Sequence, residues 1–179
     1  MELIKFSTRP GDLFIETTSG KINLSAYSSR VIRLRYTVEP EFSQKESLMV
    51  IKEAKTPTET TFRETADSLY FSTPEVTVQI NRQSLAFQFL DNDGRVLTRE
   101  PDNGGKTLIP VDVIKSIPDE DMDSTTIQGA DGLRISGRTF KEVVDRQAYH
   151  AKLEFEWTDG EALYGLGSHE EGMLNLRGQ

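Results

Sequence analysis

The sequence of 179 residues contains no cysteine, only two histidines and a single tryptophan. Without cysteine there can be no disulfide framework, thiolate metal site or cysteine nucleophile. A serine triad needs a histidine held between a serine and a carboxylate, and only His150 and His169 could supply it. Neither histidine stands at ligand spacing from a second histidine, so the spacing indicates no metal site.

The chain also lacks a long apolar run and a surplus of basic residues. No stretch approaches the roughly 20 apolar residues that span a bilayer, and the segment 1–6 lacks the basic and apolar regions of a signal peptide. These absences predict a cytoplasmic location with no membrane partner. The formal net charge of -8 and the pI near 4.9 repel phosphate backbones, so nucleic acid is not an expected partner.

Apolar and polar residues alternate with a period of two along most of the chain. The alternation is found in the ranges 21–26, 31–36, 76–80, 85–89 and 149–157. Successive side chains of a strand point to opposite faces, so each run predicts a strand with one buried face. No sustained helical stripe is present, and the nearest candidate, 140–148, is short. The pattern predicts an all-β fold, an antiparallel β-sandwich or barrel.

Turn and loop signals separate these runs. Ser19-Gly20 and the segment Asp91-Asn92-Asp93-Gly94 have the composition of tight turns. We expect Pro74 to begin a strand, where its missing N–H is tolerated. The range 99–106 predicts a polar, glycine-rich loop, and 118–130, with its acidic run, predicts a long loop.

Sequence motifs give little support for catalysis or metal binding. Gly167-Ser168-His169-Glu170 groups suggestive residues, but neighbours in sequence do not converge as a triad must. The segment 91–94 is similar to the start of a calcium loop, yet Asp102 stands where the loop needs a glutamate, so a hairpin turn is favoured. No spacing among the acidic residues identifies a pair for glycoside hydrolysis. Trp157 continues an alternating apolar face and is expected in the core.

The last part of the chain carries the most specific pattern. The range 153–178 includes Tyr-Gly-Leu-Gly at 164–167, His-Glu-Glu-Gly at 169–172 and Leu-Asn-Leu-Arg-Gly at 174–178. It resembles the junction between the N-terminal sandwich and the catalytic barrel of family 31 glycoside hydrolases, in the bacterial α-xylosidase and α-glucosidase branch. The ranges 31–36, 69–80 and 85–97 are similar to earlier strands of the same domain.

The resemblance implies a galactose-mutarotase-like supersandwich, with residues 1–179 as one N-terminal domain. It implies that the catalytic aspartates lie on a (β/α)8 barrel beyond Gln179, so no catalytic residue, cofactor or metal is assigned to this chain, which should be inactive alone. The expected partners are that barrel and, through it, a substrate with terminal α-linked glucose or xylose. The residues expected at the approach to the active site are Tyr164, Gly165, Leu166, Gly167, His169 and Arg177.

Two alternatives remain open from the sequence. A free-standing carbohydrate-binding module would need exposed aromatic side chains on one face. A structural or interaction sandwich unrelated to sugars is also compatible, because a fold alone does not determine function. If the chain normally packs on a barrel, the surface that it leaves uncovered should also promote self-association.

Overall fold

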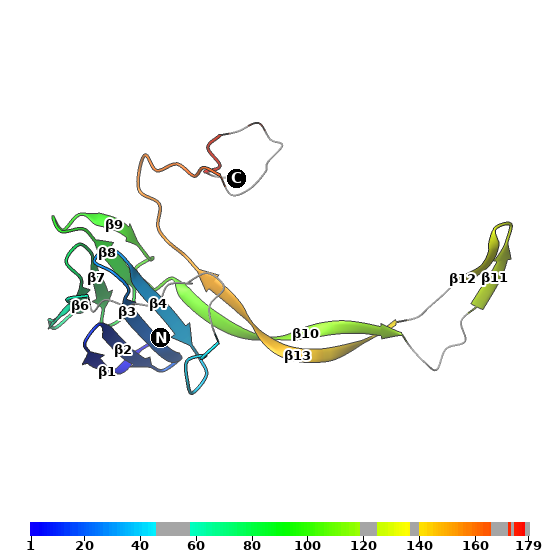
Figure 1. The fold of residues 1–179 in the computed structure, drawn as a ribbon, viewed down its shortest axis with the longest axis horizontal. Coiled ribbons are helices and arrows are strands. Elements are labelled where there is room, and N and C mark those ends of the chain that lie inside the picture. Colours follow the sequence, from blue (N-terminus) through cyan, green and yellow to red (C-terminus); the bar gives the residue numbers. More distant parts are fainter. Residues whose placement is uncertain (46–57, 119–124, 137–139, 166–171, 173, 178–179) are drawn as a thin grey trace. The chain divides into compact units, whose positions relative to one another are not determined.

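The computed structural model describes residues 1–45, 58–118, 125–136, 140–165, 172 and 174–177. Contacts divide the chain into two compact units, one formed by Met1–Gly105 with Leu153–Gln179 and the other by Lys106–Lys152. All regular structure in the described residues is β-strand, which confirms the all-β prediction (Figure 1). Among these residues there is no helix of the length and apolar character that a membrane span requires.

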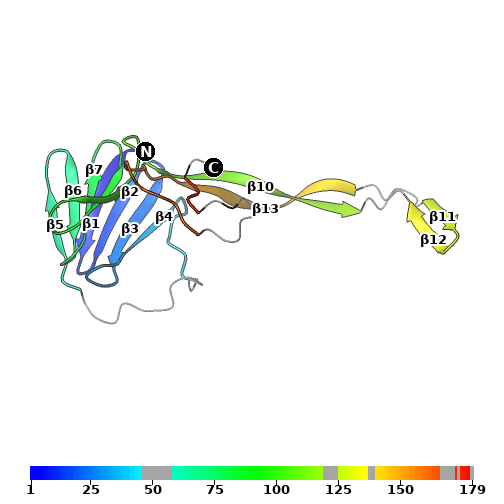
Figure 2. The ribbon, with the colours of Figure 1, turned by 90° about the horizontal axis from the view of Figure 1, so that it is seen from above.

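The first unit contains two antiparallel sheets in which every strand pairs with its neighbours in sequence (Figures 1 and 2). The four-stranded sheet consists of β1 (Leu3–Arg9), β2 (Asp12–Thr17), β3 (Gly20–Ala26) and β4 (Ile32–Thr37). The five-stranded sheet consists of β5 (Thr61–Glu64), β6 (Ser68–Ser72), β7 (Thr77–Asn81), β8 (Phe87–Leu90) and β9 (Val96–Arg99).

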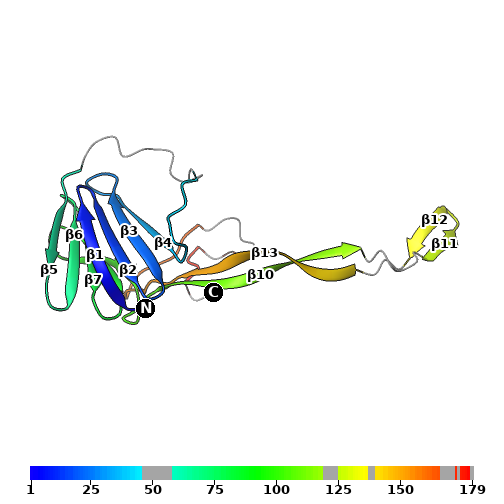
Figure 3. The ribbon, with the colours of Figure 1, turned by 90° about the horizontal axis from the view of Figure 1, so that it is seen from below.

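The hydrophobic core takes buried side chains from both sheets, as expected for a sandwich. Alternate residues of β2, β3, β6 and β7 point inward and are almost completely buried, so the period of two identified the inner faces correctly. Figure 3 shows the same strands from below. The core cluster contains Leu13, Ile15, Ile22, Leu24, Ala26, Leu69, Phe71, Val78, Ile80, Leu85 and Phe87.

A polar clamp joins the segment after β3 to the turn between β6 and β7. The Ser29 carbonyl accepts hydrogen bonds from Thr73 Oγ1 at 2.6 Å and from the Glu75 amide at 3.2 Å. The Glu75 carboxylate accepts from Ser29 Oγ at 2.8 Å and pairs with Arg30. The hydrogen bonds from Ser29 and then Arg30 lower the pKa of Glu75. The clamp therefore links the two sheets at the ends of interior strands.

The second unit consists of two-stranded sheets. β10 (Lys106–Pro118) pairs with β13 (Phe140–Leu153), and β11 (Thr125–Gly129) pairs with β12 (Gly132–Ser136). Gln147 Nε2 donates to Asp112 Oδ1 across the first pair at 3.0 Å. A two-stranded ribbon buries little apolar area, and several of its large apolar side chains are exposed: Ile109, Val111, Ile114, Phe140, Val144 and Tyr149.

Some predicted elements differ from the structure. Pro74 lies in the turn between β6 and β7, because β7 begins only at Thr77. The predicted loop 118–130 is wrong for 125–129, which forms β11; residues 119–124 lie outside the described residues. The weak helical candidate 140–148 is part of β13. The predicted loop over 99–106 is confirmed between Glu100 and Gly105, and a single domain over 1–179 stays a prediction.

Candidate functional site

The predicted site residues fall in the part of the first unit that follows β13. We call the described residues 154–165 and 174–177 the terminal segment. The Glu154 amide donates to the Gly105 carbonyl at 2.7 Å, and the Glu156 amide donates to the Arg99 carbonyl at 2.8 Å. The Glu156 carboxylate also pairs with Arg99 Nε at 2.6 Å. The start of the terminal segment is therefore fixed to the end of β9 and to the loop that follows it.

Gly105 is required for this close approach. A Cβ atom at this position would lie 2.4 Å from the Glu154 carbonyl oxygen and 3.0 Å from the Glu100 side chain. The first distance is far shorter than a van der Waals contact. The atom at that distance belongs to the backbone and cannot move aside as the end of a side chain can. Only glycine lets the two backbones lie this near to each other.

Arg177, one of the predicted residues, holds the terminal segment together. Its Nη1 donates to the Glu161 carbonyl at 2.9 Å and to the Thr158 carbonyl at 3.3 Å. The guanidinium carbon also lies 5.7 Å from the centroid of the Trp157 ring, within the range of a cation–π contact. One side chain thus connects the end of the segment to three residues near its start.

Asn175 also connects the two parts of the terminal segment, through hydrogen bonds with backbone amides. Its Oδ1 accepts from the Leu163 amide at 3.0 Å and from the Arg177 amide at 3.1 Å, while the Leu176 amide donates to the Leu163 carbonyl at 2.8 Å. Asn175 was not among the site residues predicted from the sequence. The available signal was its type, because asparagine commonly bonds a backbone amide two residues further along the chain.

The terminal segment exposes large apolar side chains. Tyr164 is 60% exposed, Leu174 is 79% exposed and Phe155 is also exposed. The expectation that Trp157 lies in the core is wrong, since 49% of this residue is exposed. The reason is that β13 ends at Leu153, so the alternation that continues to Trp157 no longer lies on a strand. Trp157 contacts Arg177 instead.

The structure places three of the six predicted site residues. Tyr164 and Arg177 belong to the terminal segment, and Gly165 has φ +84°, in the left-handed region. Leu166, Gly167 and His169 lie outside the described residues, as does the motif 167–170. The arrangement of the described residues provides exposed rings on a backbone fixed by hydrogen bonds, which is suited to packing against another surface.

The predicted turn at 91–94 is confirmed. Asp91 Oδ1 accepts from the Asp93 amide at 2.9 Å and from the Arg95 amide at 2.8 Å. The carboxylate thus closes the turn between β8 and β9. Within the described ranges, no three histidine, aspartate or glutamate side chains gather in a way that could hold a metal ion.

Replacing Arg177 with alanine should loosen the terminal segment without unfolding the sandwich. The variant loses two charge-assisted hydrogen bonds. Because the guanidinium is exposed, we expect these bonds to contribute only about 1 kcal/mol to the stability of the segment. We expect about fivefold faster hydrogen exchange at the Leu163 and Leu176 amides, measured by mass spectrometry of peptides. Arg95→Ala, at an exposed arginine of the β8–β9 turn, is the control. Unchanged exchange in Arg177→Ala would show that the guanidinium does not hold the segment.

Comparison with known proteins gives a consistent result. The profile of the glycosyl hydrolase 31 N-terminal galactose mutarotase-like domain matches residues 21–179. A family 31 α-xylosidase from Xanthomonas citri is similar over 94% of this chain and 15% of its own, with 20% identity and a TM-score of 0.62. A family 31 α-xylosidase from a soil metagenome is similar over 98% of this chain and 24% of its own, with 18% identity and a TM-score of 0.63.

A third solved structure, the family 31 dextranase of Flavobacterium johnsoniae, is similar over 66% of this chain and 15% of its own. Its identity is 17% and its TM-score is 0.55. At these identities the likeness concerns the fold. The chain spans between 15% and 24% of the length of the three solved chains.

Proposed function

Because this chain belongs to the family of glycosyl hydrolase 31 N-terminal galactose mutarotase-like domains, we propose that it is the non-catalytic N-terminal part of a retaining α-glycosidase. In this proposal the chain packs on a catalytic barrel and shapes the entrance to the active site. The enzyme would hydrolyse terminal α-linked glucose or xylose. The catalytic aspartates would lie on the barrel, encoded after Gln179.

The terminal segment is the observation that carries this proposal. It leads away from β13 with its start fixed by Glu154 and Glu156 and its end fixed by Arg177. It nevertheless leaves Tyr164 and Leu174 largely exposed. Exposed apolar side chains on an ordered backbone mark a surface that another body covers. A following barrel is the body that the family description and the similar α-xylosidases favour.

The choice between glucoside and xyloside is open to a direct test. We expect the complete encoded protein to release p-nitrophenol from the α-xyloside or the α-glucoside, and the 179-residue chain alone to release none. The β-linked isomers serve as the control substrates. Hydrolysis of the β-linked substrates only, or by the 179-residue chain itself, would contradict the proposal.

If the terminal segment docks on a barrel, a single substitution in it should lower the stability of the complete protein. Leu174→Ala in the complete protein removes apolar area that docking would bury, at a cost of about 1–3 kcal/mol at the interface. We expect a lower unfolding temperature of the complete protein and an unchanged one for the 179-residue chain, both from calorimetry. Leu97→Ala, at an exposed leucine of β9, is the matched control. Equal effects of the two substitutions would indicate that the terminal segment is not the docking surface.

A further inference from the structure

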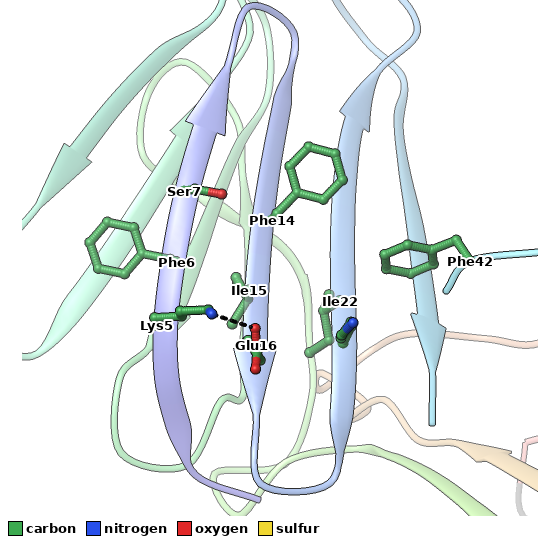
Figure 4. A pocket seen from close by; sticks show the side chains of 9 residues that line it. Lys5, Phe6, Ser7, Phe14, Ile15, Glu16, Ile22 and Phe42 are labelled. Carbon is green, nitrogen blue, oxygen red and sulfur yellow. Dashed lines mark ion pairs between the residues drawn. The ribbon is translucent and has the colours of Figure 1, made fainter. Parts of the chain in front are cut away.

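A pocket of about 170 Å³ lies on the outer face of the four-stranded sheet, the face turned away from the core (Figure 4). It is separate from the terminal segment and from any residue that the proposed function uses. Its rim carries side chains from β1, β2 and β3 and from the segment after β4. The rim residues are Lys5, Ser7, Phe14, Glu16, Lys21 and Phe42.

The strand register explains why these side chains gather. Lys5 pairs with Glu16, and Glu16 pairs with Lys21, so three charged residues form one row across β1, β2 and β3. Ser7 pairs with Phe14 in the next row on the same face. Lys5 Nζ and Glu16 Oε2 are 3.0 Å apart. Ionic groups therefore line one side of the pocket, and the Phe14 ring stands beside them (Figure 4).

Phe42 provides the second ring and is held in place by two contacts. The Arg35 guanidinium carbon lies 4.9 Å from the Phe42 ring centroid. Lys21 Nζ donates a hydrogen bond to the Pro40 carbonyl, two residues before Phe42. In Figure 4 the Phe14 and Phe42 rings stand on opposite sides of β3. The pocket therefore has an aromatic ring at each side.

A partly buried polar network around Asn23 fixes Arg35 and so supports the Phe42 side. Asn23 is 0% exposed although it is on the outer face of β3. Its Oδ1 accepts from Arg35 Nη2 at 2.8 Å and from Ser25 Oγ at 2.9 Å, and its Nδ2 donates to Asp12 Oδ1 at 3.2 Å. Satisfied buried networks of this kind are rigid. A preformed site loses less entropy when a ligand binds.

The lining restricts the chemistry of the ligand. Two aromatic rings favour a ligand with an apolar face, while Lys5, Lys21 and Ser7 can donate hydrogen bonds and Glu16 can accept them. An anion would meet the Glu16 carboxylate, and a purely apolar molecule would take the Lys5–Glu16 ion pair out of water without offering it a hydrogen bond. A sugar ring combines a C–H face with hydroxyl groups that both donate and accept. The pocket is smaller than the roughly 300–1,000 Å³ of drug-sized sites, which fits one ring.

We propose that this outer-face pocket binds one pyranose ring of a neutral saccharide. The site lies on this chain and does not depend on a barrel or on catalysis. Its role would be to hold a saccharide on the N-terminal domain. A single ring in a preformed open pocket is expected to bind with a Kd of roughly 1–10 mM.

The test measures how fast the lysine side chains of the pocket are acetylated in the full chain. The protein is acetylated with an amine-reactive ester in the presence of xylose, glucose or isomaltotriose, and labelling of each lysine is measured by peptide mass spectrometry. At five times the Kd we expect about sixfold slower labelling of Lys21 and Lys5, with Lys115 of β10 unchanged. Phe42→Ala should abolish the protection, and Phe155→Ala, at an exposed phenylalanine of the terminal segment, should keep it.

Several outcomes would overturn the proposal. The first is the absence of saturable protection by any of the three sugars, and the second is equal protection in Phe42→Ala and the parent chain. Protection by inorganic phosphate without protection by sugars would indicate an anion site instead. The unfolding temperature of Phe42→Ala verifies that the variant is folded. Hydrolysis is not measured, so failure here leaves the proposed glycosidase function untouched.

Discussion

Replacing Phe71 with alanine is expected to lower the free energy of unfolding by about 3–5 kcal/mol. Phe71 lies in β6, is only 2% exposed, and belongs to the core cluster between the two sheets. Truncation removes a large buried ring and leaves a cavity that rigid strands on both sides cannot close. Since small domains are marginally stable, a loss of this size approaches the whole stability of the sandwich.

Urea denaturation followed by circular dichroism measures this loss, with Tyr70→Ala as the control. Tyr70 is the adjacent residue of β6 and points to the opposite face, where the Arg63 guanidinium carbon lies 3.7 Å from its ring centroid. We expect its truncation to cost about 1 kcal/mol or less, mainly through the exposed cation–π contact. Similar losses in the two variants would contradict the assignment of inner and outer faces on which the fold depends.

Gly20→Ala is expected to be nearly as destabilising, by about 3 kcal/mol or more. Gly20 begins β3 with φ +142°, a conformation that costs an L-residue about 1–3 kcal/mol. In addition, a Cβ atom would lie 2.2 Å from the Thr37 carbonyl oxygen and 2.9 Å from the Tyr36 ring. Relief requires β3 and β4 to separate, and overpacking of this kind costs about 1–3 kcal/mol.

Gly11→Ala separates the two contributions in the same denaturation experiment. Gly11 has φ +82°, but a Cβ atom there meets nothing within 4 Å. Only the conformational cost remains, about 1–2 kcal/mol. If Gly20→Ala cost no more than Gly11→Ala, the close approach of β3 to β4 at this point would be refuted.

The sandwich could be predicted from the sequence because alternation reports directly on strand faces. The runs 21–26 and 31–36 correspond closely to β3 and β4, and the residues predicted on the buried face point inward: Ile22, Leu24, Ala26, Ile32, Leu34 and Tyr36. The galactose mutarotase-like sandwich inferred from the resemblance is confirmed. Leu85 is a mixed case: it is buried as its place in the pattern predicts, but it lies outside β8 with φ +56°.

The alternating pattern predicts burial wrongly where the described part of this chain provides no second layer to cover the apolar face. Tyr149 and Leu153 continue a regular pattern on β13, yet both are exposed, because a two-stranded ribbon has no second layer of its own. The pattern shows that a face is apolar but does not show what covers it. The prediction that Trp157 lies in the core is wrong for a further reason, since β13 ends at Leu153 and the alternation beyond it is not on a strand.

The candidate site was predictable only in part. Arg177 and Tyr164 were found through the resemblance of the motif 164–178, and no periodicity identifies them. Asn175 was missed because its contribution is a pair of hydrogen bonds to backbone amides, which depend on how the chain returns upon itself. The outer-face pocket also arises from register, since Phe14 and Phe42 are distant in sequence and separated by two strands.

The order of the strands sets an order of events during synthesis. Strands β1 to β4 pair only with sequence neighbours, as do β5 to β9, so the sandwich can assemble soon after Gly105 leaves the ribosome. Glu154 and Glu156, which bond to Gly105 and Arg99, are made only after the 47 residues of the second unit, Lys106–Lys152. The terminal segment is therefore made last, at a time when the sandwich can already have assembled.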